Sequence, residues 1–547
     1  MTDPVSSAEN ATTQPQTKEP QADSTWEAPY IGSRQMPRWT TGELAEPPIF
    51  GWRQIPMLLG PGLVMGAAAV GGGEWLTGPL VAAKYGGALL WLATISILGQ
   101  VLYNVEISRY TLYTGEPIFT GKFRLLPGPM FWLFIYLLMD FGSFLPYLSS
   151  NAAIPLLSMF LGRLPNPTDP NDSFLLRITG CGILILILTP LIFGGKVYRS
   201  LKYIMSAKLI IVIGFLGFLA IGYSTWDTWR EIFSGFFRFG TLPYMPAEEG
   251  GKPQLLNPIV GWWNGVTMPE LDYSMVGLIA AMAAIAGNGG LTNTPVSNFT
   301  RDQGWGMGKE VGAIPSIIGG RSIKLSHVGK VFRVTPESLV RWKGWVKHVM
   351  REQHWVWMPA CFLGMALPSM LSIQFLPRGV VPDDKWLAAG MTADGVADAV
   401  GPAMGPLFWH LTLFCGFLVL ATSAIMTADG ALRRWVDVSW TASKTLRTWD
   451  THWIGKLYFG ALCAYAVVGM ILLNIVPGDS LLIWTTTFYN FALGFSCWHV
   501  TVVNSVLLPK ELRPSKRRRC LLVLAGMFYT LIAILATIDS FGLYKSA

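Results

Sequence analysis

A break in the middle of one hydrophobic run constrains the fold of this chain more than any other stretch. The run covers residues 61–85, about 25 positions, which is enough to cross a hydrocarbon core of about 30 Å. Three consecutive glycines at positions 71–73 and then Glu74 interrupt it. Each glycine costs a helix about 1 kcal/mol relative to alanine, and a carboxylate at mid-membrane costs at least about 2.5–3.5 kcal/mol. A span that only anchors a protein would avoid both.

Two interpretations of this break remain open. Transporters use broken helices to turn free backbone groups towards a substrate at the midplane, where non-helical backbone is packed in protein or lines a wet cavity. Alternatively, the glycines form a face for close helix packing, and Glu74 bonds to a neighbouring helix.

The composition indicates a polytopic membrane protein. Of 547 residues, 51% are hydrophobic and only 14% are charged, and apolar runs of near 20 residues recur along the chain. The net charge of +8 lies in short loops between these runs, so membrane topology explains it better than nucleic-acid binding does. The six cysteines form no C-x-x-C pair, which argues against a disulfide framework or a zinc site, and we expect no cofactor.

The hydrophobic pattern predicts an all-α fold with eleven transmembrane spans. Residues 1–50 are polar and are expected to form a disordered cytoplasmic tail, followed by a transporter domain over residues 51–547. Lysine and arginine gather in the loops that follow even-numbered spans. By the positive-inside rule, this pattern predicts that the N-terminus lies on the cytoplasmic side of the cell membrane. The expected spans are at about 55–83, 87–112, 128–161, 175–194, 201–223, 273–298, 353–376, 405–428, 455–476, 480–508 and 519–541.

A second break interrupts the sixth span, five helices after the first. Glycine, asparagine and threonine fill residues 287–294, where Asn288 and Asn293 can bond to freed backbone groups. Two broken helices five spans apart predict an inverted repeat with a midplane site between the breaks. The alternative is that the sixth span simply ends at Gly287 and a polar loop begins.

The run GPGLVMGAAAVGGGEWLTGPLVAAKYGGALLW, continuing to Arg109 and Thr114-Gly115, resembles the start of the Nramp family of divalent metal ion transporters. The register is gapless over this stretch, whereas the rest of the chain matches mainly in helix number and break positions. The resemblance implies the leucine-transporter fold, with broken first and sixth helices, and proton-coupled uptake of manganese, iron or similar ions.

The chain departs from the family at the motifs that define its chemistry. The family's first-helix motif Asp-Pro-Gly-Asn is matched by Gly71, Gly72, Gly73 and Glu74, and its sixth-helix motif Met-Pro-His by Ala286, Gly287 and Asn288. The backbone-carbonyl ligands of the family fall at Ala68 and Ala283. The ligating aspartate, the thioether and the histidine are therefore absent, which puts selectivity for transition metals in doubt.

The residues that remain at the breaks offer oxygen ligands. Glu74 and the amides of Asn288 and Asn293 suit hard ions such as magnesium, calcium or manganese, whereas thioether and imidazole favour softer metals. Magnesium keeps several waters and often uses one or two carboxylates, so a single glutamate is enough. We expect Glu74 and Asn288 to be the metal ligands. An Nramp-related branch of magnesium transporters also lacks the methionine.

Proton coupling is expected from Asp140, the acid on the third span, or from Lys208, about two turns inside the fifth span. The alternative for Lys208 is that its side chain snorkels to the membrane surface. Glu106 and Arg109 are three residues apart, a spacing that predicts an ion pair on one helix face.

The leading hypothesis is therefore a secondary transporter of divalent cations, coupled to protons and embedded in the lipid bilayer. An amino-acid or organic-solute carrier on the same fold is the second hypothesis, because the glycines can admit an organic substrate. A transport-inactive sensor or scaffold is the third. The sequence contains neither H-E-x-x-H nor G-x-S-x-G, and an enzyme is not expected.

Overall fold

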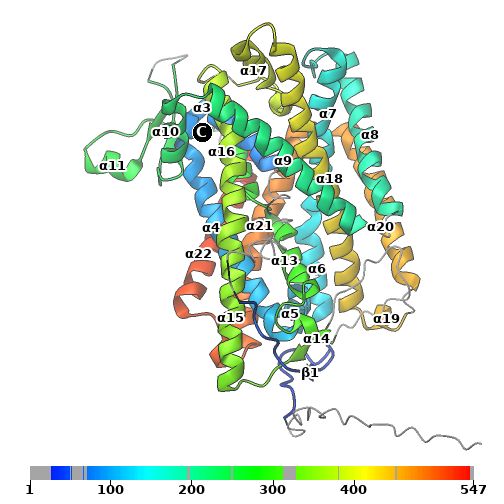
Figure 1. Cartoon of the computed structure of the whole chain (residues 1–547). Coiled ribbons are helices and arrows are strands. Elements are labelled where there is room, and N and C mark those ends of the chain that lie inside the picture. The colour runs from blue at the N-terminus through cyan, green and yellow to red at the C-terminus, as the bar shows by residue number, and fades with distance from the viewer. Residues whose placement is uncertain are drawn as a thin grey trace, which may run out of the picture.

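The computed structural model describes residues 26–49, 51, 66, 71–193, 197–247, 251–311, 328–379, 381–449 and 452–542. These residues form a bundle of long helices with two small two-stranded sheets (Figure 1). Eight stretches of the described residues are long and apolar enough to cross a membrane. The prediction of an all-helical, polytopic membrane protein is therefore confirmed.

The expected number of eleven spans stays a prediction. The first two expected spans lie partly outside the described residues and partly within one helical stretch, Gly73–Thr114. Gly86, with a φ of 64°, ends the first helix of this stretch and allows the chain to turn into the next. The fifth expected span is the helix Val197–Tyr223, of which Ala207–Tyr223 is the apolar part.

In the first half of the bundle, the expected first break falls at the edge of the described residues, since residues 67–70 lie outside them and Gly71 forms a bend. A π-helical turn at Gly73–Thr77 (η2) leads into α3, and π-helical turns inside helices are frequent at functional sites. The elements of this half are η2, α3 (Gly78–Tyr85), η3 (Gly86–Leu89), α4 (Leu90–Thr114), α5 (Ile118–Arg124), α6 (Pro129–Met139), η4 (Asp140–Phe144), α7 (Tyr147–Leu161), α8 (Pro170–Phe193) and α9 (Val197–Tyr223).

A connection outside the bundle links the two halves. It comprises α10 (Trp226–Gly235), the antiparallel pair β2 (Leu242–Tyr244) and β3 (Gln254–Leu256), and α11 (Pro258–Trp263). After α11 the chain returns to β2, where Leu271 forms a bridge with Tyr244. It then enters α12 (Val276–Ile285), which packs against the two last long helices of the chain.

The second half contains the second break, and here the helix is interrupted and then resumes. The helix α12 ends at Ile285, and Gly287, Gly289 and Gly290 adopt φ values of 108°, 67° and 52°, which non-glycine residues rarely reach. A short turn, η5 (Gly290–Asn293), follows, and α13 (Pro295–Asp302) then begins with a proline at its first position, where no backbone donor is needed. The interpretation in which a polar loop begins at Gly287 is therefore wrong.

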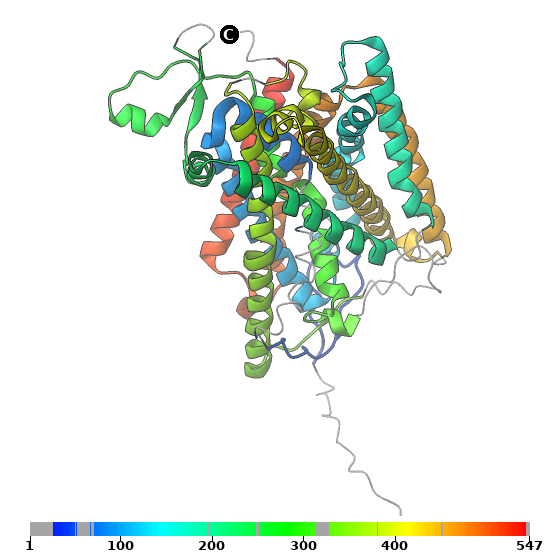
Figure 2. The same ribbon diagram turned by 45° about the horizontal axis from the view of Figure 1, so that its top comes forward.

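The rest of this half consists of α14 (Gly308–Val311), α15 (Pro336–Glu352), η6 (Gln353–Trp357), α16 (Met358–Phe375), η7 (Lys385–Ala389), α17 (Ala393–Val400), α18 (Gly405–Ala442), α19 (Lys444–Arg447), α20 (His452–Ile475), α21 (Gly478–Val506), η8 (Lys510–Leu512) and α22 (Lys516–Ser540). The helix α18 continues well beyond the expected span at 405–428. Figure 2 shows this long helix crossing the bundle beside α9.

Residues 26–49 differ from the disordered tail that was expected over residues 1–50. They pack against one end of the bundle, where β1 (Thr40–Thr41) pairs in parallel with β4 (Lys330–Val331). Trp39 is buried, and the guanidinium of Arg124 lies over its ring. The indole of Trp345 donates to the carbonyl oxygen of Ala45 at 2.8 Å. These contacts come from distant parts of the chain, so local composition did not reveal them. The remainder of the expected tail, residues 1–25 and 50, lies outside the described residues.

Candidate functional site

The two breaks meet at Glu74. Its carboxylate is buried and accepts hydrogen bonds from the backbone N–H groups of Gly71 and Gly287, each at 2.9 Å. A Cβ atom on Gly73 would lie 2.2 Å from the carbonyl oxygen of Ile285, so only glycine permits this approach of the two helices. One carboxylate therefore joins the glycines at the start of η2 to the second break.

A glutamine on α4 holds the second break in place. The Gln100 side-chain oxygen accepts from the backbone N–H groups of Asn288 and Gly289 at 3.1 and 3.2 Å, and from the amide nitrogen of Asn293 at 2.9 Å. Its nitrogen donates to the carbonyl oxygen of Ala286 at 2.8 Å. Sequence reasoning missed Gln100, although an uncharged amide inside an apolar span is a signal that could have drawn attention to it.

The structure brings most of the predicted site residues together. Residues 71–74, Ala283, Ala286 and Asn293 are buried, and Asn288 is half-buried. Ala68 lies outside the described residues. The ring of Trp357 is close to Gly287, and that of Tyr147 is close to Gly72, so aromatic side chains wall the site on two sides.

Few side-chain atoms at this site could coordinate a metal ion. The amide nitrogen of Asn288 donates to the side-chain oxygen of Asn293 at 3.4 Å, while Glu74 supplies the carboxylate. Among the described residues, no group of three or more histidine, cysteine, aspartate or glutamate side chains gathers as a metal cluster would. A cation held here would therefore rest on Glu74, amide and backbone oxygens, and its own water molecules, since an ionised carboxylate can accept further bonds beyond the two it has.

Lys208 reaches the interior of the bundle from α9. Its ammonium donates to the hydroxyl of Ser423 on α18 at 3.0 Å, and the side chain is fully buried. It therefore does not snorkel to the membrane surface.

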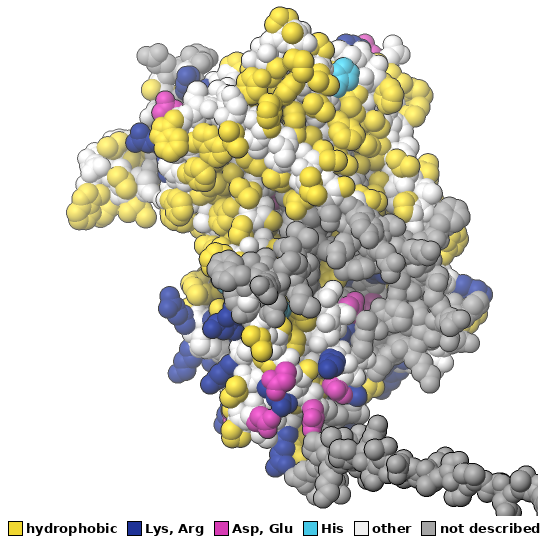
Figure 3. All heavy atoms as spheres, in the orientation of Figure 1, with side chains coloured by type: hydrophobic (Ala, Val, Ile, Leu, Met, Phe, Trp, Pro, Cys, Tyr) yellow, Lys and Arg dark blue, Asp and Glu magenta, His cyan; other side chains and the backbone are white. Residues whose placement is uncertain are grey.

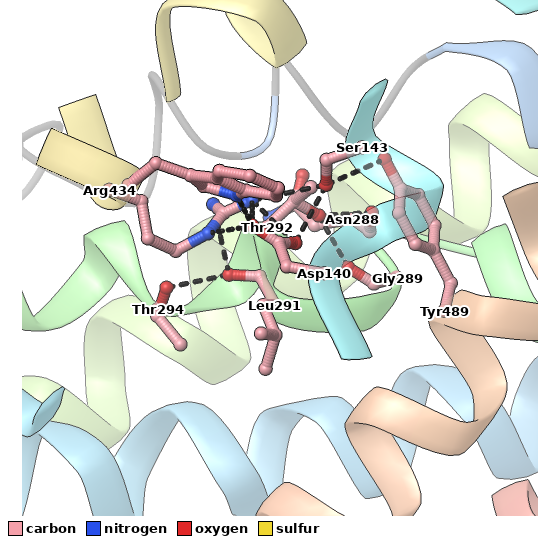
Figure 4. A network of polar contacts seen from close by, with 10 residues as sticks. Asp140, Ser143, Asn288, Gly289, Leu291, Thr292, Thr294, Arg434 and Tyr489 are labelled. Carbon is pink, nitrogen blue, oxygen red and sulfur yellow. Dashed lines mark hydrogen bonds and ion pairs between the residues drawn. The ribbon is translucent and has the colours of Figure 1, made fainter. Parts of the chain in front are cut away.

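Asp140 forms a buried ion pair with Arg434 beside the second break (Figure 4). The two carboxylate oxygens accept from Arg434 Nε and Nη2 at 2.7 and 2.8 Å, and further from Ser143 and the Trp435 indole, both at 2.7 Å. Arg434 Nη1 also donates to the carbonyl oxygen of Leu291, at 3.5 Å, in η5. This network therefore joins η4, α18 and the second break.

The partner of Asp140 was not predicted, because the expected eighth span ends at residue 428 and Arg434 then falls in the basic loop expected after it. The helix α18 continues through that position to Ala442 and turns the arginine inward. The ion pair predicted between Glu106 and Arg109 is confirmed, with Nε and Oε2 2.8 Å apart.

Comparisons with known proteins show the fold but no family. No protein-family model matches the sequence, and no curated protein matches it. Among solved structures, a mutant of the Eremococcus coleocola manganese transporter is similar, with a TM-score of 0.59, 12% identity, and coverage of 92% of this chain and 91% of that one. The same transporter in complex with an aromatic bis-isothiourea compound gives a TM-score of 0.55, 12% identity, and coverage of 90% and 89%. The shared architecture extends over nearly the whole of both chains.

Proposed function

We propose that this chain is a secondary active transporter that carries divalent cations by alternating access, with the ion held between the two breaks. The observation that supports this most is the bridge made by Glu74 between the Gly71 and Gly287 backbones. A buried carboxylate at the junction of two interrupted helices supplies the negative charge that a cation requires.

Hard ions such as magnesium or manganese fit the available atoms. The described residues at the breaks offer carboxylate, amide and carbonyl oxygens, which such ions prefer. The Ala286 carbonyl oxygen accepts one hydrogen bond from Gln100 and has a second lone pair. This oxygen is therefore a candidate ligand for an ion beside Glu74 and Asn288, with Ala283 and Ala68 as further carbonyl candidates. Gln100 would hold it in position.

Proton coupling follows from the charges around the site. A divalent cation bound at Glu74 would repel a positive charge on Lys208, which is buried in the interior of the bundle and bonded to Ser423. Asp140 is the second candidate, because its ion pair with Arg434 reaches the second break through Leu291. Movement of that break would therefore disturb the pair.

The orientation of the chain is supported by the distribution of charge. Lysine and arginine side chains gather at the end of the molecule that carries α15 and β1 (Figure 3). By the positive-inside rule, this end faces the cytoplasm, and it is the end on which residues 26–49 pack. A cell-membrane location is part of this proposal.

One observation favours the second candidate, an organic-solute carrier. Backbone N–H groups of residues 287–289 all donate to oxygens, those of Glu74 and Gln100. Successive N–H groups of this kind form a nest that suits an anion, such as the carboxylate of an amino acid.

Uptake into proteoliposomes tests these candidates. The purified protein is given magnesium, manganese, calcium and cadmium ions and a panel of amino acids, with and without a pH gradient, and protein-free liposomes serve as the control. We expect saturable uptake of magnesium or manganese that increases with the gradient. Amino-acid uptake without metal uptake would support the organic-solute carrier, and no uptake of either would support a transport-inactive sensor.

A further inference from the structure

An uncharged arm extends from the connection between α10 and α12. Residues 253–268, PQLLNPIVGWWNGVTM, contain no aspartate, glutamate, lysine or arginine. They include β3 and α11, and no residue of α11 is buried. Trp262 and Trp263 are 75% and 81% exposed, and Ile259, Val260 and Val266 are exposed as well. A soluble surface rarely carries so many adjacent exposed apolar side chains unless they contact a partner or a membrane.

The arm projects sideways from the bundle. In Figures 1 and 2, α11 lies away from the long helices, beyond α10. Figure 3 shows hydrophobic side chains on this arm at the same level as hydrophobic side chains on the bundle surface. The helix α10 and the residues that follow it expose four further aromatic side chains, Trp226, Phe233, Phe237 and Phe239. The arm and α10 therefore both add exposed apolar side chains near the level of the apolar bundle surface.

Backbone hydrogen bonds hold the arm in a defined position. The N–H of Met245 donates to the carbonyl oxygen of Glu270 at 2.8 Å, and the N–H of Asp272 donates to that of Pro243 at 3.0 Å. The amide nitrogen of Asn257 donates to the carbonyl oxygen of Phe239 at 2.8 Å, while its side-chain oxygen caps α11 by accepting from the N–H groups of Ile259 and Val260. The arm is thus fastened to the chain just before α12, so its sideways direction is fixed by the fold.

We propose that residues 253–268 lie in the headgroup region of the bilayer leaflet at this end of the bundle, with Trp262 and Trp263 as the anchors. Tryptophan is enriched at this depth because its ring is amphipathic, and a segment without charge pays little to enter it. Lipid is the partner that would cover the apolar face, because the arm extends sideways from the bundle, into the space that the surrounding bilayer fills. Since residues 270–272, which are bonded to the hairpin, come just before α12, the anchor would tie one half of the second broken helix to the membrane surface. This proposal does not depend on the substrate.

A fluorescent probe at the arm tests this placement. Trp263→Cys is labelled with the environment-sensitive dye NBD, in a background in which Cys181, Cys463 and Cys520 are replaced by serine. Lys252→Cys, exposed on the same connection but outside the uncharged stretch, is the matched control. Both proteins are placed as single copies in phosphatidylcholine nanodiscs, and the full chain is used throughout.

We expect the dye at position 263 to emit at shorter wavelength than at position 252. It should be quenched several-fold less by aqueous iodide and more by lipid that carries a nitroxide at shallow depth. Equal iodide quenching at both positions would overturn the proposal. Protection only in discs that hold two copies would also overturn it, because the occupant would then be a second chain. If Trp263→Cys is not monodisperse, Trp262→Cys gives the same readout from the neighbouring anchor.

Discussion

Replacement of Gly73 by alanine should separate the two breaks. The added Cβ would lie 2.2 Å from the Ile285 carbonyl oxygen, whereas ordinary contact begins at 3.4 Å, so backbone must move by the difference, about 1.2 Å. The hydrogen bond of 2.9 Å between Gly287 N and Glu74 Oε1 would then lengthen to about 4 Å, beyond hydrogen-bonding distance. Helix propensity alone would favour alanine, and the packing clash opposes it.

The expected net effect is a loss of roughly 1.5–5 kcal/mol of unfolding free energy. Overpacking costs about 1–3 kcal/mol and a hydrogen bond to a charged group contributes about 1.5–3 kcal/mol, while the removal of glycine from a helix returns about 1 kcal/mol. Unfolding in mixed detergent micelles measures this, with Gly182→Ala on α8 as the control, since nothing lies within 4 Å of its added Cβ. The reasoning is refuted if Gly73→Ala is as stable as the control.

Three further predictions concern the polar residues around the site. Gln100→Leu leaves the N–H groups of Asn288 and Gly289 without their acceptor and should cost about 1–3 kcal/mol per unsatisfied group, measured by unfolding in micelles; unchanged stability would contradict its role. Either Asp140→Asn or Arg434→Met alone should cost about 3–5 kcal/mol, and the double variant should recover much of this in a double-mutant cycle, whereas additive losses would show that the pair is not coupled. Lys208→Met should keep the fold and lose the dependence of uptake on a pH gradient; unchanged dependence would give this lysine a structural role only.

Features written in local sequence could be predicted, and features that arise from distant contacts could not. The break at residues 287–290 could be predicted because glycine accepts any backbone angle, and the structure confirms positive φ at Gly287, Gly289 and Gly290. Gln100 was missed because its role depends on backbone groups almost two hundred positions further along the chain. Arg434 was misplaced because an arginine after an apolar span is typical of a loop, and only Asp140 on another helix makes its burial favourable.

The packing of residues 26–49 could not be predicted for a related reason. This segment is too polar to form a core of its own, so composition predicts disorder. Its few large apolar residues, such as Met36 and Trp39, instead complete the packing of the bundle at the end that carries α5 and β4. Contacts with the bundle therefore order residues 26–49, and the sequence of this segment alone does not indicate these contacts.

Uptake of magnesium and manganese by Glu74→Gln tests the central claim, that Glu74 is the charged ligand of the transported ion. Glutamine keeps the shape of the side chain and can still accept from the Gly287 N–H through its remaining oxygen, but it removes the negative charge. We predict saturable uptake by the wild type and by the surface control Glu337→Gln. In the monodisperse Glu74→Gln protein, apparent affinity should fall at least about tenfold, equivalent to about 1.4 kcal/mol. Normal saturable uptake of both ions by Glu74→Gln would contradict the ligand assignment.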